Sequence, residues 1–141
     1  MHQVKNYKIE TLYLAISIAD RYLVNLVIRF EDKPVDFSSL AVASLFVAAK
    51  IEQPFRPSLD RLVATVNSMA GYGHLTMQTR EKVAAYEHVI LIELEFSVHF
   101  VSPLLFLDRF ERIFGVDENK EENRQIRSFG RHMCLFSQRD D

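Results

Sequence analysis

The stretch SLAVASLFVAAKIE, residues 39–52, decides the fold. Between Ser39 and Lys50 every residue except Ser44 is apolar, and four of the apolar residues are alanines. Alanine favours helix over strand, and a helix that is apolar on all sides must be covered on all sides. The run is well short of the roughly 20 apolar residues that a membrane span needs. The stretch therefore predicts a helix in the middle of a core, with the rest of the chain wrapped around it.

The chain around this stretch has apolar residues at three- and four-residue steps, which predicts further helices. We expect them at residues 10–30, 59–70, 78–94, from Pro103 to Gly115, and 124–136. Ser58 and Ser102 are placed to cap two of these helices. The second half of 78–94 is almost wholly apolar and is expected to be buried more deeply than the first, and the apolar stripe of 106–114 is assigned to a core. No strand pattern is visible, so the predicted fold class is all-α with about six helices.

Composition limits the classes of partner. The chain has 141 residues, 48% of them hydrophobic, and a net charge of -2, which fits one domain or one domain and part of another. Lys and Arg are scattered between acidic residues, so direct nucleic-acid binding is disfavoured. The single cysteine, Cys134, excludes an internal disulfide. We find no signal peptide or membrane-spanning segment, and therefore expect an intracellular protein that does not bind a membrane.

An enzyme is a second possible class of function for this sequence. The five histidines show no metal-ligand spacing on one helical face, and no HExxH motif is present. His132 and Cys134 lie close in sequence but lack a third partner, and Gly71 and Gly73 follow a helix rather than a strand. The sequence therefore predicts no catalytic residue, no metal site and no cofactor.

Three charged residues lack a partner of opposite charge on their own helix. Lys50 has no carboxylate three or four residues away, Glu87 interrupts an apolar line, and Asp20 stands among apolar neighbours. Such charges are costly unless a distant group completes them. Lys50, near the C-terminal end of its helix, could interact favourably with the helix dipole, and Glu87 could pair with Lys50 across two adjacent helices. The alternative is that a partner molecule supplies the missing groups.

Three segments resemble the cyclin box. They are ETLYLAISIADRYL (10–23), AVASLFVAAKIEQPFRP (41–57) and AAYEHVILIELEFSV (84–98), the last followed by a Ser-Pro helix start. The resemblance covers residues 7–114 in collinear order and makes 39–52 the third, central helix of the box. It implies a cyclin-box helical bundle around that buried helix over residues 1–101, without the first helix of the box, and the start of a truncated second box over 102–141.

The resemblance also implies a binding site. In cyclins, a lysine at the end of the third helix and a glutamate in the fifth hydrogen-bond the main chain of a cyclin-dependent kinase, next to its αC helix. Those positions match Lys50 and Glu87. The flanking contacts of the family fall on Ile51, Gln53, Leu91, Phe96 and Val98.

The implied function is that of a regulatory subunit that activates such a kinase, in transcription or cell-cycle control, in the nucleus and also the cytoplasm. The stretch KIEQPFRP resembles the transcription-associated C, K, L and T types more than the mitotic cyclins. Without the first helix, Asp20 would lose its family partner, and apolar surface would be exposed for self-association. The alternative function is a cyclin-fold adaptor or scaffold that binds proteins without activating a kinase.

Overall fold

The computed structural model describes residues 7–29, 34–55, 57–69, 76–99, 101–115, 123, 125, 127–130 and 133. The chain divides into two compact units, Met1–Phe100 and Val101–Asp141. This division lies one residue before the boundary expected at 101/102, and the assignment of the second unit to a second cyclin box stays a prediction. The described residues are helices and their connections and include no strand, which confirms the all-α fold class.

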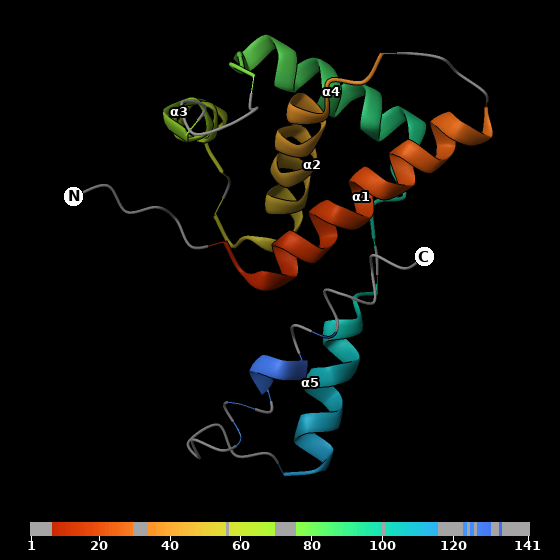
Figure 1. Ribbon diagram of the computed structural model, residues 1–141, viewed down its shortest axis with the longest axis vertical. Helices are drawn as coiled ribbons and strands as arrows, with labels where there is room; N and C mark the ends of the chain where they lie inside the picture. Colours follow the sequence, from red (N-terminus) through yellow and green to blue (C-terminus); the bar gives the residue numbers. More distant parts are fainter. Residues whose placement is uncertain are drawn as a thin grey trace. The chain divides into compact units, whose positions relative to one another are not determined.

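The first unit contains four helices arranged around one of them. These are α1 (Ile9–Ile28), α2 (Phe37–Glu52), α3 (Leu59–Met69) and α4 (Arg80–Glu93). Figure 1 shows α2 between α1 and α4, and α2 contacts all three other helices. The predicted central helix is confirmed, because nine of its 16 residues are buried and Ala43, Ala48 and Ala49 are wholly inaccessible. Small side chains let the neighbouring helices approach its backbone closely.

Helix α2 begins two residues earlier than predicted. Asp36 is its N-cap, and its carboxylate accepts hydrogen bonds from the backbone N–H groups of Ser38 and Ser39 at 3.1 and 3.2 Å. Ser39 also donates its hydroxyl to Asp36 at 2.8 Å. Hydrophobicity alone placed the start at Ser39, whereas the capping geometry places it at Phe37, whose side chain is exposed.

Of the apolar stripe expected on helix α1, Ala15, Tyr22 and Leu26 are buried, but Leu12 is 45% exposed. Tyr13 and Ile18, which lie outside that stripe, are wholly inaccessible. The length and composition of α1 would also suffice to cross a membrane, with a mean hydropathy of 1.4 over an 18-residue window. The expectation that no segment has the length and composition of a membrane span was therefore wrong. Ser17 and Asp20 interrupt the apolar run of α1, but its mean hydropathy still reaches that of a span. Core helices of soluble proteins pass the same test, and α1 packs against α2 in the core.

Helix α4 is buried along one face only. Val83 and Ile90 are wholly inaccessible, and Leu94, which caps the helix, is 4% exposed. Val89 and Ile92, however, are 42% and 52% exposed, so the expectation of a deeply buried second half is wrong for these two residues. The reason is geometric: residues 90 and 94 share the face toward the core, while 89 and 92 lie on other faces.

The second unit is described from α5 (Pro103–Ile113) onward. The Ser102 hydroxyl caps it by accepting the Leu104 N–H at 3.1 Å, as predicted. Gly115, where the helix was expected to end, follows two residues after Ile113 with a left-handed φ of +64°. Leu104 is buried, but the aromatic residues Phe106 and Phe110 are 57% and 55% exposed, so the assignment of this stripe to a core is wrong. In the expected helix 124–136 the described residues 125, 127–130 and 133 are helical, and the others lie outside the described residues.

Candidate protein-binding site

Lys50 and Glu87 form an ion pair that joins α2 to α4. Lys50 lies in the last turn of α2, and its Nζ donates a hydrogen bond to Oε1 of Glu87. The Lys50 side chain is 40% exposed and that of Glu87 17% exposed. The two charges that lacked partners on their own helices therefore complete each other across a helix–helix contact, at the surface rather than in the core.

The pair keeps hydrogen-bonding capacity for another molecule. The Lys50 ammonium also lies 4.2 Å from the centroid of the Phe46 ring, which is itself buried. An ammonium has three N–H donors and a carboxylate has two acceptor oxygens, so one bond between them leaves both groups able to bind further. A main-chain segment, which carries both carbonyl acceptors and N–H donors, matches that capacity. The Phe46 ring and the ion pair together fix the position of the ammonium.

The other five predicted site residues divide into two groups. Ile51 and Phe96 are exposed, at 36% and 68%. Gln53 is partly buried and donates its amide to the Thr11 hydroxyl at 2.8 Å, so its side chain already links α2 to α1. Leu91 and Val98 are partly buried and pack against the core. The structure thus brings Lys50 and Glu87 together, while the binding role of all seven residues stays a prediction.

The turn after α4 gives Phe96 its exposed position. Glu95 and Phe96 have left-handed φ angles of 50° and 58°, which non-glycine residues rarely adopt. The Phe96 N–H donates to the Leu91 carbonyl at 2.8 Å, and the Glu95 N–H donates to the Ile92 carbonyl at 2.9 Å. These bonds satisfy carbonyls at the helix end in the manner of a Schellman motif. Sequence analysis missed this turn because it contains no glycine.

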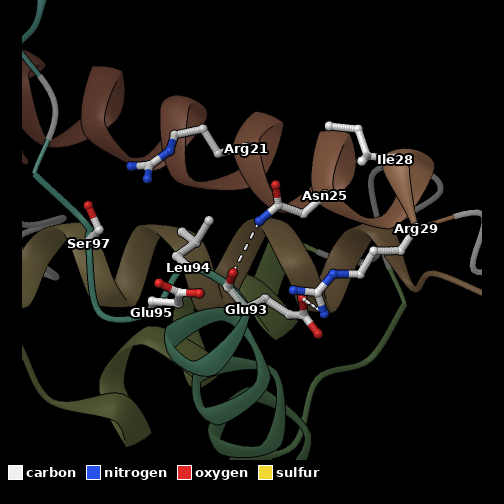
Figure 2. A pocket seen from close by; sticks show the side chains of 8 residues that line it. All are labelled: Arg21, Asn25, Ile28, Arg29, Glu93, Leu94, Glu95 and Ser97. Carbon is white, nitrogen blue, oxygen red and sulfur yellow. Dashed lines mark hydrogen bonds and ion pairs between the residues drawn. The ribbon is translucent and has the colours of Figure 1, made fainter.

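An open pocket of about 370 Å³ lies between α1 and the end of α4 (Figure 2). Arg21, Asn25 and Arg29 line it from α1, at successive four-residue steps. Across the pocket, Glu93 accepts a hydrogen bond from Asn25 and forms an ion pair with Arg29. The polar residues Arg21, Asn25 and Arg29 at four-residue steps were a sequence signal for this pocket. The sequence analysis did not use that signal.

Asp20 is exposed, and partial burial of its carboxyl group raises its pKa. It makes no hydrogen bond or ion pair with the residues that the structure describes. Within the same described ranges, no group of three or more His, Cys, Asp or Glu side chains could hold a metal ion. The Lys50–Glu87 pair itself offers N–H donors and carboxylate acceptors at the surface.

The N-terminal part of the chain matches a known family. The family model described as cyclin, N-terminal domain, matches residues 1–99. The chain belongs to the cyclin family. That span contains α1 to α4 and all seven predicted site residues. No solved structure matched this cyclin chain.

Three similar curated proteins are named G2/mitotic-specific cyclins. The G2/mitotic-specific cyclin-3 of Saccharomyces cerevisiae is 33% identical over 121 residues, which are 85% of this chain and 25% of that protein. The G2/mitotic-specific cyclin-4 of the same yeast, Saccharomyces cerevisiae, is 32% identical over 108 residues, which are 77% of this chain and 21% of that protein. The G2/mitotic-specific cyclin-B of Dictyostelium discoideum is 30% identical over 109 residues, which are 77% of this chain and 22% of that protein.

This cyclin chain spans between 21% and 25% of the length of these relatives. None of the three is named as a transcription-type cyclin, so the expected likeness to the C, K, L and T types is not supported. That expectation rested on the eight residues KIEQPFRP. The two prolines in this stretch restrict the backbone after α2 and do not indicate a class of partner.

Proposed function

We propose that this cyclin chain binds a cyclin-dependent protein kinase and favours its active form in control of the cell division cycle. Family membership supports kinase regulation, and the names of the relatives support cell division over transcription. The observation that carries the proposal is the Lys50–Glu87 pair, which joins two helices at the surface and keeps free hydrogen-bonding capacity. We also propose a nuclear location.

The mechanism requires no chemistry from the cyclin. A kinase is active when a lysine–glutamate ion pair forms with its αC helix swung in and its activation loop ordered. A cyclin that binds the αC-in form more tightly than the αC-out form shifts the kinase toward activity by that difference in affinity. A change from nearly off to nearly on needs about 5.5 kcal/mol. Helices packed around a buried α2 provide the rigid surface that such selection requires.

The two charges and the apolar side chains have different tasks in this proposal. Lys50 donates to a carbonyl and Glu87 accepts from an N–H of the kinase main chain, which sets the register of the two proteins. Ile51 and Phe96 supply exposed apolar area, and this area provides most of the affinity. The net charge of -2 supports a protein partner rather than direct binding to nucleic acid.

The test measures the Kd for a purified monomeric cyclin-dependent kinase with Lys50→Ala and Glu87→Ala. Each substitution should raise the Kd about thirtyfold or more, because a hydrogen-bonded charge at an interface costs roughly 2 kcal/mol or more to remove. Arg80→Ala is the matched control, since it breaks another ion pair between helices, Arg80–Asp60, outside the proposed site. Circular dichroism should show unchanged helical content in all three variants.

A charge exchange separates recognition from structure. Lys50→Glu combined with Glu87→Lys restores an ion pair between α2 and α4 but reverses donor and acceptor toward the kinase. We expect the exchanged chain to fold normally and to bind as weakly as the single variants. Undiminished binding by both alanine variants would contradict the proposed site. Tight binding that leaves kinase activity unchanged would favour the scaffold function instead.

A further inference from the structure

Asn25 of α1 and Arg29, the C-cap of α1, hold the last residue of α4 by its main chain and its side chain. Asn25 Nδ2 donates to the backbone carbonyl of Glu93 at 3.1 Å, and Arg29 NH1 lies 2.9 Å from the Glu93 carboxylate oxygen Oε2 (Figure 2). Asn25 and Arg29 are one helical turn apart and so face the same way. We call Asn25, Arg29 and Glu93 the Glu93 clamp. Figure 2 shows Arg21, one turn earlier, extending away from Glu93.

The clamp acts directly before the left-handed turn. Leu94 follows Glu93 and is anchored in the core, and the next two residues, Glu95 and Phe96, have φ angles of 50° and 58°. Side chains with a Cβ disfavour this conformation, so it persists where the surrounding structure fixes it. The hydrogen bond from Asn25 fixes the main chain at residue 93, and burial of Leu94 fixes the next position. Together with the bond from the Phe96 N–H to the Leu91 carbonyl, these two restraints hold the turn that leads to Phe96.

We propose that Asn25 and Arg29 are positioning residues, which set the direction of Phe96 toward a protein partner without touching that partner. This inference rests on the proposed function, in which Phe96 is a contact of the kinase. The Asn25 bond is the stronger of the two restraints, because Arg29 is 51% exposed and its ion pair is screened by water. The loss of the Asn25 bond frees the carbonyl of Glu93 and lets the turn relax to ordinary φ values.

The experiment is a double-mutant cycle between Asn25→Ala and Phe96→Ala, with the Kd for a purified cyclin-dependent kinase as the readout. Asn25→Ala alone should raise the Kd about fivefold, the equivalent of one hydrogen bond. In the Phe96→Ala chain the same substitution should add no further loss, because Asn25 acts through Phe96. Hydrogen exchange at the Phe96 amide should become faster in Asn25→Ala, since its bond to Leu91 depends on the turn.

Arg21→Ala is the matched control, because Arg21 lines the same pocket from the same helix but does not contact Glu93. It should leave both the Kd and the exchange rate unchanged, and a loss equal to that of Asn25→Ala would overturn the inference. If the Asn25→Ala chain fails to fold, Arg29→Ala removes only the ion pair and goes through the same cycle with a smaller expected effect.

The two levels of the proposal fail in different ways. If Phe96→Ala weakens kinase binding and Asn25→Ala does not, the positioning role is overturned and the proposed function stands. If Phe96→Ala binds as tightly as the parent chain, Phe96 is not a contact and the inference fails with it. Additive losses from Asn25→Ala and Phe96→Ala would also overturn it, because they would show that Asn25 acts independently of Phe96.

Discussion

The Lys50–Glu87 ion pair needs to contribute little to stability in order to serve the proposed kinase recognition. The Lys50 side chain is 40% exposed, so the bond to Glu87 is partly screened and is worth on the order of 0.5 kcal/mol. At an interface the same groups lose their water and become far more sensitive to substitution. This difference in solvent is why the alanine variants should bind weakly and still fold.

Asp36 makes a prediction about acid stability. Hydrogen bonding from the Ser39 hydroxyl, together with the backbone N–H groups of Ser38 and Ser39, lowers the pKa of this carboxyl below its ordinary value of 3.8. A lowered folded-state pKa stabilises the fold above the unfolded-state pKa, and that stability is lost as the pH falls through the folded-state pKa. Asp36→Ala should lower the free energy of unfolding by about 1 kcal/mol at pH 7, because it removes the N-cap of α2.

Urea unfolding of both chains between pH 7 and pH 3 checks this prediction. The difference between Asp36→Ala and the parent chain should shrink as the pH falls below 3.8, because the parent carboxylate is then being protonated. Asp36→Asn is the control, since asparagine caps helices as well as aspartate but does not titrate. An equal difference at both ends of the pH range would show that charge has no part in the cap.

The sequence revealed some of these residues and concealed others for physical reasons. Lys50 and Glu87 were predictable because each lacked a partner on its own helix, and the structure shows that they meet. The Asp36 cap was visible in the sequence as an aspartate shortly before the apolar run, because aspartate is a preferred N-cap residue. Asn25 was not predictable, because its acceptor is a backbone carbonyl 68 residues away and main-chain acceptors leave no trace in a sequence.

At the scale of the helix, periodicity predicted where the helices lie better than it predicted which of their side chains are buried. The starts of α3 and α5 were correct because local signals, Ser58 and the pair Ser102-Pro103, mark them. The exposure of Val89 and Ile92 was not predictable, because burial depends on how many neighbours a helix has, and α4 packs on the core along one face. The apolar content of a helix can be read from its sequence, whereas the burial of each side chain depends on which other helices pack against it.

The left-handed turn after α4 predicts a stabilising substitution. Glu95 occupies the position after the helix cap, with a φ of 50°, where glycine is the usual residue. Glu95→Gly removes a strain of about 1–2 kcal/mol and adds about 0.5–1 kcal/mol of backbone entropy loss on folding, so the free energy of unfolding should rise by about 0.5–1 kcal/mol.

Chemical denaturation monitored by circular dichroism measures this gain. Ser97→Gly provides the control, because Ser97 follows the same turn but is not among the positive-φ residues that the structure describes, and it should be neutral or destabilising. A Glu95→Gly chain that is less stable than its parent would show that the Glu95 side chain contributes more than its backbone conformation costs.

At the scale of the whole molecule, buried and exposed apolar surface are unevenly shared between the two units. The first unit surrounds α2 with a contiguous core drawn from all four of its helices. In the second unit, α5 buries Leu104 and packs Leu107 against Gly130, but its aromatic side chains are largely exposed. Exposed apolar side chains gathered on one helix favour association in water.

Phe110 and Phe114 therefore predict concentration-dependent self-association of this chain. They are 55% and 77% exposed and lie four residues apart, so they extend one face at the end of α5. Phe110→Ser combined with Phe114→Ser should shift sedimentation toward the monomer without loss of helical content. Met69→Ser is the matched control, because Met69 is 56% exposed at the end of α3 in the first unit. If the double variant associates as strongly as the parent chain, the association surface lies elsewhere, and the exposed apolar residues of α1, such as Val27 and Ile28, become the next to substitute.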